Sequence, residues 1–396
     1  MKIGYFTDMF PYKNPRTGEA IKSYYGGGVG DVVYNLTLNM AKRGHEIYIF
    51  TKAVDENDST LNCGNIHVIR YKSRFKVGMA LISPKILYRP LYSDVDLDII
   101  HSHIGNFPAP LGGALYAKIR KKPFVVTYHE DMTGGYGSLI RRTAIWFLNT
   151  SVVDRILSQA DAVLTPSEYY IEKSKHLSKI KDKVTSIPNG IILEDYQRKY
   201  SKKESRDILD LPQQENIILF VGSLTPRKAP DVLVKAMSLV LKRCPDSRLL
   251  FVGDGYYQND LETLAKEYGI RENTTFMGFV DDDTKKLCYS ASDVFVLPSR
   301  SEGFGIVLLE ASAYGLPLVV SDLEVFHSVV QEGYNGFFTE TENERDLASK
   351  IVNLLEDAHL RKEMGENAKE RVKKFSWDSI TNETLKLYVE VLGSRS

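Results

Sequence analysis

Short apolar runs alternate with amphipathic, helix-length segments along the whole chain. Strands that are apolar at every position are buried on both faces, and the helices between them indicate parallel sheets covered on both sides. We therefore predict an α/β fold of two doubly wound domains. The strands predicted for the first half are 3–7, 46–51, 67–71, 98–101, 124–128, 162–165 and 184–187. The helices predicted there are 29–43, 110–120, 139–158 and 167–178.

The alternation restarts after a turn at Pro188-Asn189-Gly190 and a polar run at 197–207, which together predict a linker with a hinge near 188–212. The strands predicted beyond it are 217–221, 249–252, 275–277, 294–297 and 317–320. The helices are 230–243, 258–268, 283–291, 306–314, 324–332, 345–356 and 359–374. The final segment 377–392 either caps the second domain or returns to the first. Two such sheets facing each other leave a cleft at the carboxyl ends of their strands, where ligands bind.

Composition agrees with two ordinary domains. The chain has 396 residues, 43% of them hydrophobic, which is enough for two cores and gives no sign of disorder. Its three cysteines (Cys63, Cys244 and Cys288) are scattered and form no close metal or redox pair, so we expect a reduced, cytoplasmic protein. The first residues follow a strand pattern rather than that of a signal peptide. No apolar run reaches the roughly 18 residues that span a bilayer.

The charge is balanced overall but uneven along the chain. Residues 1–185 carry 25 Lys and Arg against 17 Asp and Glu, a balance of +8, and the remainder carries 26 against 34, a balance of −8. A basic first half suits an anionic partner, such as a phosphate or the surface of an anionic membrane. The alternative is a solvated surface whose composition varies along the chain. We expect no nucleic-acid partner.

Two glutamates carry the most specific chemical signal. Glu302 and Glu310 flank a glycine-bearing turn and the start of a helix, directly after the strand predicted at 294–297. The backbone N–H groups and the positive end of such a helix form an anion site. The Glu310 carboxylate can accept hydrogen bonds from two vicinal hydroxyls, and Glu302 can contact the other end of a ligand. A nucleotide sugar has this layout; the alternative for Glu310 is an acid that merely complements the helix dipole.

Basic and glycine-rich segments supply further candidates. Arg227 and Lys228 follow the strand at 217–221, where fixed cations can stabilise a leaving pyrophosphate. The alternative is a solvated basic pair in a loop. The glycine run 26–30 opens a helix and either closes on a phosphate or forms a loop tip. Its distance from the first strand does not fit the G-x-G-x-x-G pattern of a nicotinamide or flavin site. We therefore predict no cofactor.

Three histidines are placed near predicted strand ends. His129 follows the strand at 124–128 and precedes an acidic, glycine-bearing loop. If it faces the cleft it can contact a sugar hydroxyl or developing charge; the alternative is a structural hydrogen-bonding group. His101 and His103 are placed at the end of another strand, where each is either an active residue or a structural hydrogen-bonding group. No histidine and carboxylate cluster has a firm metal-ligand spacing, so we predict no metal.

In its ordered series of motifs the chain resembles the retaining glycosyltransferases of family 4, whose GT-B architecture combines two Rossmann-like domains. The resemblance spans almost the whole chain. The motifs are Gly27-Gly28-Val29, His129, Pro188-Asn189-Gly190, the loop 222–228, Val252-Gly253-Asp254-Gly255, Gly278-Phe279-Val280 and the pair Glu302 and Glu310. The resemblance implies an acceptor-binding domain at 1–187, completed by a C-terminal helix at 377–396, and a donor-binding domain at 188–376.

The resemblance also implies a role for each matching residue. The catalytic residues are His129, Lys228 and Glu302. The donor-binding residues are Gly27, Gly28, Ser223, Arg227, Lys228, Val280, Gly303, Phe304, Gly305, Ile306, Val307 and Glu310. By the resemblance, Glu302 contacts the transferred sugar and the backbone amides of 303–307 bind the diphosphate. Glu310 binds the ribose hydroxyls, and Val280 lies where the backbone receives the base. Ser223 departs from the arginine that many members have at this place, so either Arg227 supplies the missing charge or the diphosphate is held less strongly.

The implied reaction moves a hexose from a nucleotide diphosphate sugar to an acceptor hydroxyl with retention and without a metal. The acceptor, which is lipid-linked, a saccharide or a small molecule, is selected by the first domain, with loops 72–90 and 132–146 as candidates. The mixed basic and apolar character of 72–90 suits peripheral contact with an anionic membrane. The alternative is a helix-containing loop that packs on its own domain. The alternatives are a nucleotide-sugar epimerase or phosphorylase of the same architecture, and a non-catalytic nucleotide-sugar-binding protein.

Overall fold

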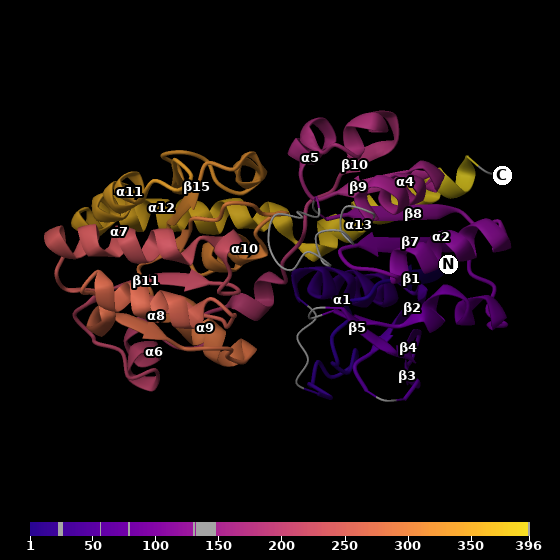
Figure 1. Cartoon of the computed structure of the whole chain (residues 1–396), viewed down its shortest axis with the longest axis horizontal. Coiled ribbons are helices and arrows are strands. Elements are labelled where there is room, and N and C mark those ends of the chain that lie inside the picture. The colour runs from indigo at the N-terminus through magenta and orange to yellow at the C-terminus, as the bar shows by residue number, and fades with distance from the viewer. Residues whose placement is uncertain (23–26, 56, 78–79, 130, 132–147, 395–396) are drawn as a thin grey trace. The chain divides into compact units, whose positions relative to one another are not determined.

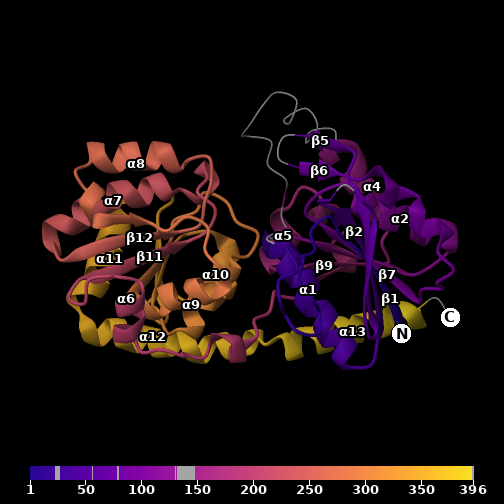
Figure 2. The same cartoon turned by 90° about the horizontal axis from the view of Figure 1, so that it is seen from below.

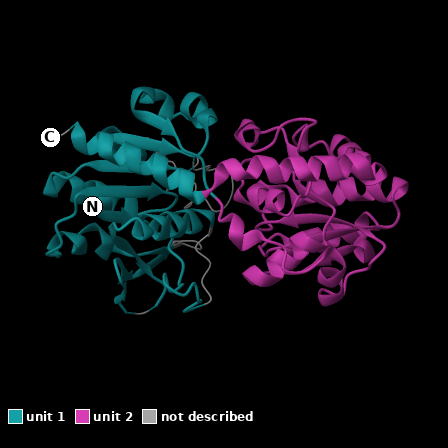
Figure 3. Ribbon diagram, turned by 180° about the vertical axis from the view of Figure 1, so that it is seen from behind, with its two compact units in different colours: residues 1–190, 377–396 teal, residues 191–376 magenta. Residues whose placement is uncertain are grey.

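The computed structural model describes residues 1–22, 27–55, 57–77, 80–129, 131 and 148–394. The chain divides into two compact units (Figure 3). Unit 1 is Met1–Gly190 with Trp377–Ser396, and unit 2 is Ile191–Ser376. Each unit has a central, largely parallel sheet between helices (Figure 1), so the predicted α/β class with two doubly wound domains is confirmed.

Unit 1 is built on an eight-stranded sheet in the order β10-β9-β8-β7-β1-β2-β4-β3. Its strands are β1 Lys2–Phe6, β2 Glu46–Ala53, β3 Ser59–Cys63, β4 Ile66–Lys72, β7 Ile99–Ile104, β8 Phe124–Tyr128, β9 Ala162–Thr165 and β10 Val184–Ser186. All pairings are parallel except that of β3 with β4. A separate hairpin joins β5 Phe75–Val77 to β6 Ala80–Ile82. Strands such as β7 and β8 are buried at every position, which explains their continuous apolar pattern.

The α-helices of unit 1 are α1 Gly27–Lys42, α2 Ala109–Arg120, α4 Asp154–Gln159, α5 Glu168–Lys173 and α13 Trp377–Gly393. A π-helix, Leu148–Val153, precedes α4. Helix α13 packs beside α1 (Figure 2). The Arg43 guanidinium, just after α1, ion-pairs with Asp378 and donates from Nε to Oδ1 of Asn382 at 3.1 Å. The C-terminal segment therefore belongs to unit 1, the second of the two places that the sequence left open.

Unit 2 has a fully parallel six-stranded sheet in the order β13-β12-β11-β14-β15-β16. Its strands are β11 Asn216–Val221, β12 Ser247–Val252, β13 Thr274–Phe276, β14 Val294–Leu297, β15 Leu318–Ser321 and β16 Gly336–Thr339. Its α-helices are α6 Lys202–Ile208, α7 Pro230–Arg243, α8 Gln258–Glu267, α9 Asp282–Ala291, α10 Ile306–Ala313, α11 Glu344–Glu356 and α12 Ala358–Val372. Helices α7 and α8 cover one face, and α6 and α9 lie on the other (Figure 2).

The predicted linker at 197–207 is wrong in its second half, because Lys202–Ile208 forms helix α6. Ser201 caps this helix in a capping box with Glu204, a signal that the sequence contained. The Arg206 side chain is buried, and its NH2 group donates to Oδ2 of Asp293 at 2.8 Å. The polar sequence at 197–207 therefore includes a helix, and a buried ion pair between Arg206 and Asp293 attaches this helix to the core of unit 2.

Other boundaries also differ from the prediction. His101 and His103 lie inside β7, which extends to Ile104, rather than at the end of a strand. The helix predicted at 324–332 is only a short 3₁₀-helix, Glu324–Ser328, and α5 ends at Lys173. Strands β3, β5, β6 and β16 were not predicted at all. Among the helices in the described part of the chain, none combines the length and apolar character that a bilayer-spanning helix needs.

Candidate active site residues

Three charged side chains meet at the carboxyl end of β11 and β14. Lys228, in the short 3₁₀-helix Pro226–Lys228 after β11, pairs with Oε1 of Glu302. The Arg227 guanidinium lies 3.8 Å from Oε2 of the same carboxylate. Glu302 is only 6% exposed, so its carboxylate is largely shielded from water, whereas Arg227 and Lys228 are half-buried. The structure thus brings together the two cations and the first glutamate of the predicted site.

The protonation state of Glu302 follows from this cluster. Burial acts to raise the pKa of Glu302, but Lys228 and Arg227, with hydrogen bonds from Lys228 and from Ser299, outweigh burial and hold its pKa below the ordinary value. The hydrogen bond from Ser299 Oγ to Oε1 measures 3.3 Å. Glu302 is therefore an anion at neutral pH, with positive charge fixed beside it.

Close backbone packing shapes the loop that carries the cations. Leu224 N donates to Asp254 O at 2.8 Å. A Cβ atom at Gly255 would lie 2.1 Å from Leu224 O, and one at Gly253 would lie 2.2 Å from Gly222 O. The V-G-D-G motif is thus required sterically, because its glycines let two loops touch.

A residue that the sequence analysis did not identify, Arg300, anchors the same loop. Its guanidinium forms a bidentate pair with Asp231 of α7 at 3.0 and 2.8 Å, and its Nε donates to Glu342 at 2.8 Å. Its backbone N–H donates to Arg227 O at 2.8 Å. Arg300 therefore joins the Arg227 and Lys228 turn to the segment that leads to Glu302. No spacing in the sequence identified this role.

The turn after Glu302 opens helix α10. Gly305 has φ = +82° and is the N-cap residue, a left-handed conformation that favours glycine. The structure records no hydrogen bond from the backbone N–H groups of Gly303, Phe304, Gly305, Ile306 or Val307 to any described residue. Together with the positive end of the helix dipole, these amides can bind an anion beside the Lys228 cluster.

Glu310 sits in a second cluster, buried to 6% exposure. Its Oε1 accepts from Tyr196 Oη at 2.7 Å and Lys285 Nζ at 3.0 Å, and its Oε2 accepts from Tyr289 Oη at 2.7 Å. A carboxylate offers about four acceptor positions. Three are occupied here, so two vicinal hydroxyls can bind only if one of these donors leaves. Tyr196, Lys285 and Tyr289 lie outside the sequence motifs and were not predicted as site residues.

Two other predicted donor-binding residues lie on exposed or half-exposed loops of unit 2. Ser223 is exposed in the loop after β11, and its carbonyl accepts from Thr225 N at 2.9 Å. Val280 is half-buried and follows Gly278, whose carbonyl accepts from Gly253 N at 2.9 Å. Arg227 lies beside Lys228 and Glu302, and its replacement of the arginine absent at 223 stays a prediction.

In unit 1, the predicted glycines begin a helix. Helix α1 starts at Gly27, two residues earlier than predicted, so Gly27 and Gly28 form its first turn. Gly30 packs against Met9, with its hypothetical Cβ 3.5 Å from the Met9 carbonyl carbon. Gly26, Glu130 and the candidate acceptor loop 132–146 lie outside the described residues. The structure describes each unit by itself, so the cleft that would join Gly28 and His129 to Lys228 and Glu302 stays a prediction.

His129 is 5% exposed, one residue beyond β8. Its Nε2 lies 3.0 Å from Nδ1 of His103, and the two rings are stacked with centroids 5.3 Å apart. Burial lowers the pKa of His129 to about 4, so the ring is neutral at physiological pH. His129 can therefore exchange hydrogen bonds with a ligand but does not carry a positive charge.

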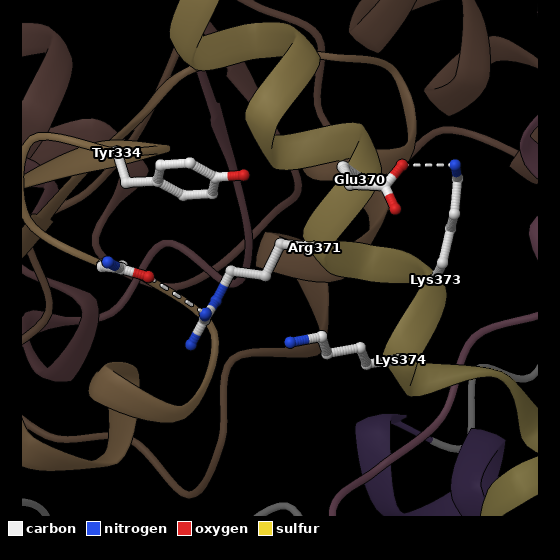
Figure 4. A pocket seen from close by; sticks show the side chains of 6 residues that line it. Tyr334, Glu370, Arg371, Lys373 and Lys374 are labelled. Carbon is white, nitrogen blue, oxygen red and sulfur yellow. Dashed lines mark hydrogen bonds and ion pairs between the residues drawn. The ribbon is translucent and has the colours of Figure 1, made fainter.

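A separate hollow of about 360 Å³ in unit 2 is lined by Gln331, Tyr334, Glu370, Arg371, Lys373 and Lys374 (Figure 4). Arg371, the cation at the centre of this view, already has protein partners. Arg371 donates to Val329 O at 2.7 Å and to Ser328 O at 2.9 Å, and Lys373 pairs with Glu370. Arg371 therefore holds α12 against the 328–331 segment beside this hollow, and we assign the hollow no ligand. Within the described residues, no group of three His, Cys, Asp or Glu is arranged to hold a metal ion.

Comparison with known proteins gives two family matches. The model described as Glycosyltransferase Family 4 matches residues 26–195, and that described as Glycosyl transferases group 1 matches residues 201–371. An uncharacterized glycosyltransferase of Methanocaldococcus jannaschii is 29% identical over 384 residues, 93% of this chain and 96% of that protein. Phosphatidyl-myo-inositol mannosyltransferase of Mycolicibacterium smegmatis is 27% identical, over 93% of this chain and 91% of that protein. The structure of sucrose-phosphate synthase from Thermosynechococcus elongatus superposes with a TM-score of 0.79 at 25% identity, covering 100% of both chains.

Proposed function

Because the chain belongs to the family 4 glycosyltransferases of the GT-B fold, we propose that it transfers a hexose from a nucleotide diphosphate sugar to an acceptor hydroxyl, with retention of the anomeric configuration. The observation that carries the proposal is the arrangement at the start of α10. Lys228 and Arg227 flank the buried Glu302 carboxylate, directly before a run of backbone amides without partners among the described residues.

In this reaction the bond from the sugar anomeric carbon to the diphosphate oxygen breaks, and a bond to the acceptor oxygen forms on the same face. The acceptor proton passes to the leaving phosphate oxygen, so no separate protein base is required. Negative charge grows on the diphosphate as its bond breaks. Lys228, Arg227 and the α10 amides are fixed donors that stabilise this charge more strongly in the transition state than in the ground state.

Glu302 has two roles in the proposal. In the free protein it neutralises Lys228 and Arg227, two half-buried cations, and they in turn keep its own buried carboxylate charged. When the donor binds, the diphosphate takes over part of that neutralisation, and the carboxylate accepts hydrogen bonds from sugar hydroxyls. Since Glu302 is an anion held by two cations, it can switch partners without changing its protonation state.

The test is donor turnover by Lys228→Ala, with Lys203→Ala, which removes an exposed cation of α6, as the matched control. A thermal-shift screen of UDP, GDP and ADP hexoses first identifies the donor. Loss of a single charge-stabilising donor typically lowers turnover by about 10²–10³. We expect that loss for Lys228→Ala and none for Lys203→Ala. Equal activity of both variants would overturn the site, and donor conversion without any acceptor would indicate an epimerase instead.

We further propose that unit 1 contacts an anionic membrane near its acceptor. Exposed aromatic side chains, Phe75 at 58%, Tyr88 at 48% and Tyr92 at 77%, lie in one segment of the chain. The exposed cations Arg74, Lys76 and Arg89 are interleaved with them. Each such cation contributes about 1 kcal/mol near an anionic bilayer, and aromatic rings favour the interface. The mannosyltransferase relative, whose name includes a phosphatidyl lipid, supports an acceptor at a membrane.

Vesicle sedimentation decides this part of the proposal. We expect binding to vesicles rich in phosphatidylglycerol at low salt, release at high salt, and no binding to phosphatidylcholine. The double variant Arg74→Gln/Lys76→Gln is expected to weaken binding. Lys173→Gln/Lys175→Gln, which removes two exposed cations near α5, is the control with the same charge change. Equal binding by both variants would refute the assignment of this surface.

A further inference from the structure

A column of buried rings runs through unit 1 on one face of its sheet. His101 and His103 are two residues apart on β7, so their side chains share a face, and their ring centroids lie 4.4 Å apart. His101 Nδ1 is 2.5 Å from Tyr388 Oη of α13, and its Nε2 is 2.7 Å from Thr127 Oγ1. The column therefore begins at the C-terminal helix and continues through His101 and His103 to His129.

The contact between His103 and His129 constrains which ring nitrogen carries the proton. Burial, reinforced for His103 by the neighbouring histidines, lowers the pKa of both rings, so both are neutral. A 3.0 Å contact between two neutral imidazoles needs one N–H donor and one bare nitrogen. The hydrogen bond therefore couples the tautomers of the two rings.

The other nitrogen of His103 selects between the two arrangements. His103 Nε2 is buried and has no hydrogen-bond partner among the described residues. If His129 donated, His103 Nε2 would carry an orphaned buried N–H, and such donors are rarer in proteins than unsatisfied acceptors. The favoured arrangement has His103 Nδ1–H donating to His129 Nε2. His129 then carries its proton on Nδ1, which has no recorded partner among the described residues.

We propose that His103 is a positioning residue for the transfer reaction: it holds the His129 ring in place and fixes it as the Nδ1–H tautomer. This rests on the proposed function, in which His129 contacts the sugar. The Nδ1–H of His129 then donates to a sugar or leaving-group oxygen. Because His103 is 1% exposed, it acts through His129 and does not itself contact substrate.

Spectroscopy tests the tautomer independently of activity. With ¹⁵N-labelled histidine, the eight histidines of the chain give assignable ring nitrogens, and His129→Ala identifies the His129 signals. We expect a protonated Nδ1 and a bare Nε2 for His129 in the wild type. His103→Phe keeps an aromatic ring in the stack but removes the donor, so the His129 proton should move to Nε2. His103→Asn places an amide donor near the position of Nδ1 and should restore the original tautomer.

Kinetics provide the second readout. His103→Phe is expected to lower kcat by about ten- to hundredfold, the range for a misplaced catalytic group, with the donor KM changed less than about twofold. His103→Asn should recover most of kcat. Tyr5→Phe is the matched control, because it removes the 3.2 Å hydroxyl contact with Tyr388 in the same column and does not touch His129.

The outcomes separate the two proposals. If His129→Ala keeps full activity, the proposed role of His129 fails while the tautomer measurement still stands. If His129→Ala loses activity but His103→Phe does not, the positioning role of His103 is refuted. A protonated Nε2 on His129 in the wild type would also refute it. Thermal unfolding of each variant, compared with that of Tyr5→Phe, shows whether an activity loss comes from unfolding.

Discussion

Replacing Tyr196 by phenylalanine should weaken the fold and strengthen nucleotide binding at the same time. In the free protein the Tyr196 hydroxyl donates to Oε1 of Glu310 at 2.7 Å, beside Lys285 Nζ at 3.0 Å. If Glu310 binds both ribose hydroxyls, the wild-type protein must first break a contact of this kind. The Tyr196→Phe protein has no such contact to break.

The two effects have the same origin and should match in size. A hydrogen bond to a charged group contributes about 1.5–3 kcal/mol, and the half-buried position of Tyr196 indicates the lower end. The free variant should therefore lose about 1.5 kcal/mol of unfolding free energy. It should bind the nucleoside diphosphate about tenfold more tightly, since 1.4 kcal/mol corresponds to a factor of ten. With saturating nucleotide, the two proteins should have similar stability.

Calorimetric titration with the nucleoside diphosphate of the donor, together with denaturant unfolding, measures both quantities. The 2′,3′-dideoxynucleotide is the control, because it lacks the hydroxyls that compete with Tyr196, and the variant should bind it no better than the wild type does. Weaker binding of the ribonucleotide by Tyr196→Phe would refute the reasoning. It would mean that Tyr196 contacts the bound nucleotide rather than occupying its place.

Three other predictions concern Glu302, Gly255 and Ser201, at separate places in unit 2. Glu302→Gln should lower transfer. Because the pKa of Glu302 is depressed in the folded protein, its ion pairs stabilise the fold at pH values above the ordinary carboxylate pKa of 4.5. This stabilisation is lost as the pH falls through the lower pKa of the folded protein. The stability gap between wild type and Glu302→Gln, measured by denaturant titration at several pH values, should therefore close in acid, and a constant gap would contradict this. Gly255→Ala places a Cβ 2.1 Å from Leu224 O, so it should cost about 1–3 kcal/mol of stability and reduce donor turnover. Gly269→Ala is the control: its added Cβ has no atom within 4 Å, but its φ is +70°. It therefore measures the cost of backbone strain without steric overlap. Ser201→Ala removes the N-cap of α6 and should cost about 1 kcal/mol in thermal unfolding without changing turnover, and an unchanged melting temperature would indicate that the Arg206 anchor alone sets the helix.

The sequence predicted best those features that depend on neighbouring residues. The strands 124–128, 162–165 and 294–297 and the helix 230–243 have the predicted bounds, because continuous burial and an early proline mark them locally. The association of Arg227 and Lys228 with Glu302 followed from motif order rather than from geometry. The motifs identified which residues belong to the site, whereas the contacts between those residues came only from the structure.

What the sequence could not provide were partners far apart along the chain. The donors to Glu310 come from positions 114, 25 and 21 residues away, namely Tyr196, Lys285 and Tyr289. The pair of His103 and His129 spans 26 residues. The sequence placed His101 and His103 at the end of one strand, but it did not show that their rings would stack on one face or that His101 would hydrogen-bond Tyr388 of α13. Helix α6 was missed although its capping box was present, because Arg206 reaches its buried partner Asp293 only in the folded unit.

The return of α13 to unit 1 fixes the order in which the newly made chain can complete its folding. Tyr388 is fully buried and bonded to His101, yet it is synthesised after all of unit 2. On the ribosome, unit 2 has its whole sequence available while unit 1 still lacks the helix that covers its histidine column. The chain enters unit 2 at Ile191 and leaves it at Ser376. These two ends of unit 2 are joined, because Ile191 N donates to Phe375 O at 2.7 Å. Unit 2 is thus an insertion within unit 1, and a chain truncated before Trp377 leaves unit 1 unfinished even though residues 1–190 are all present.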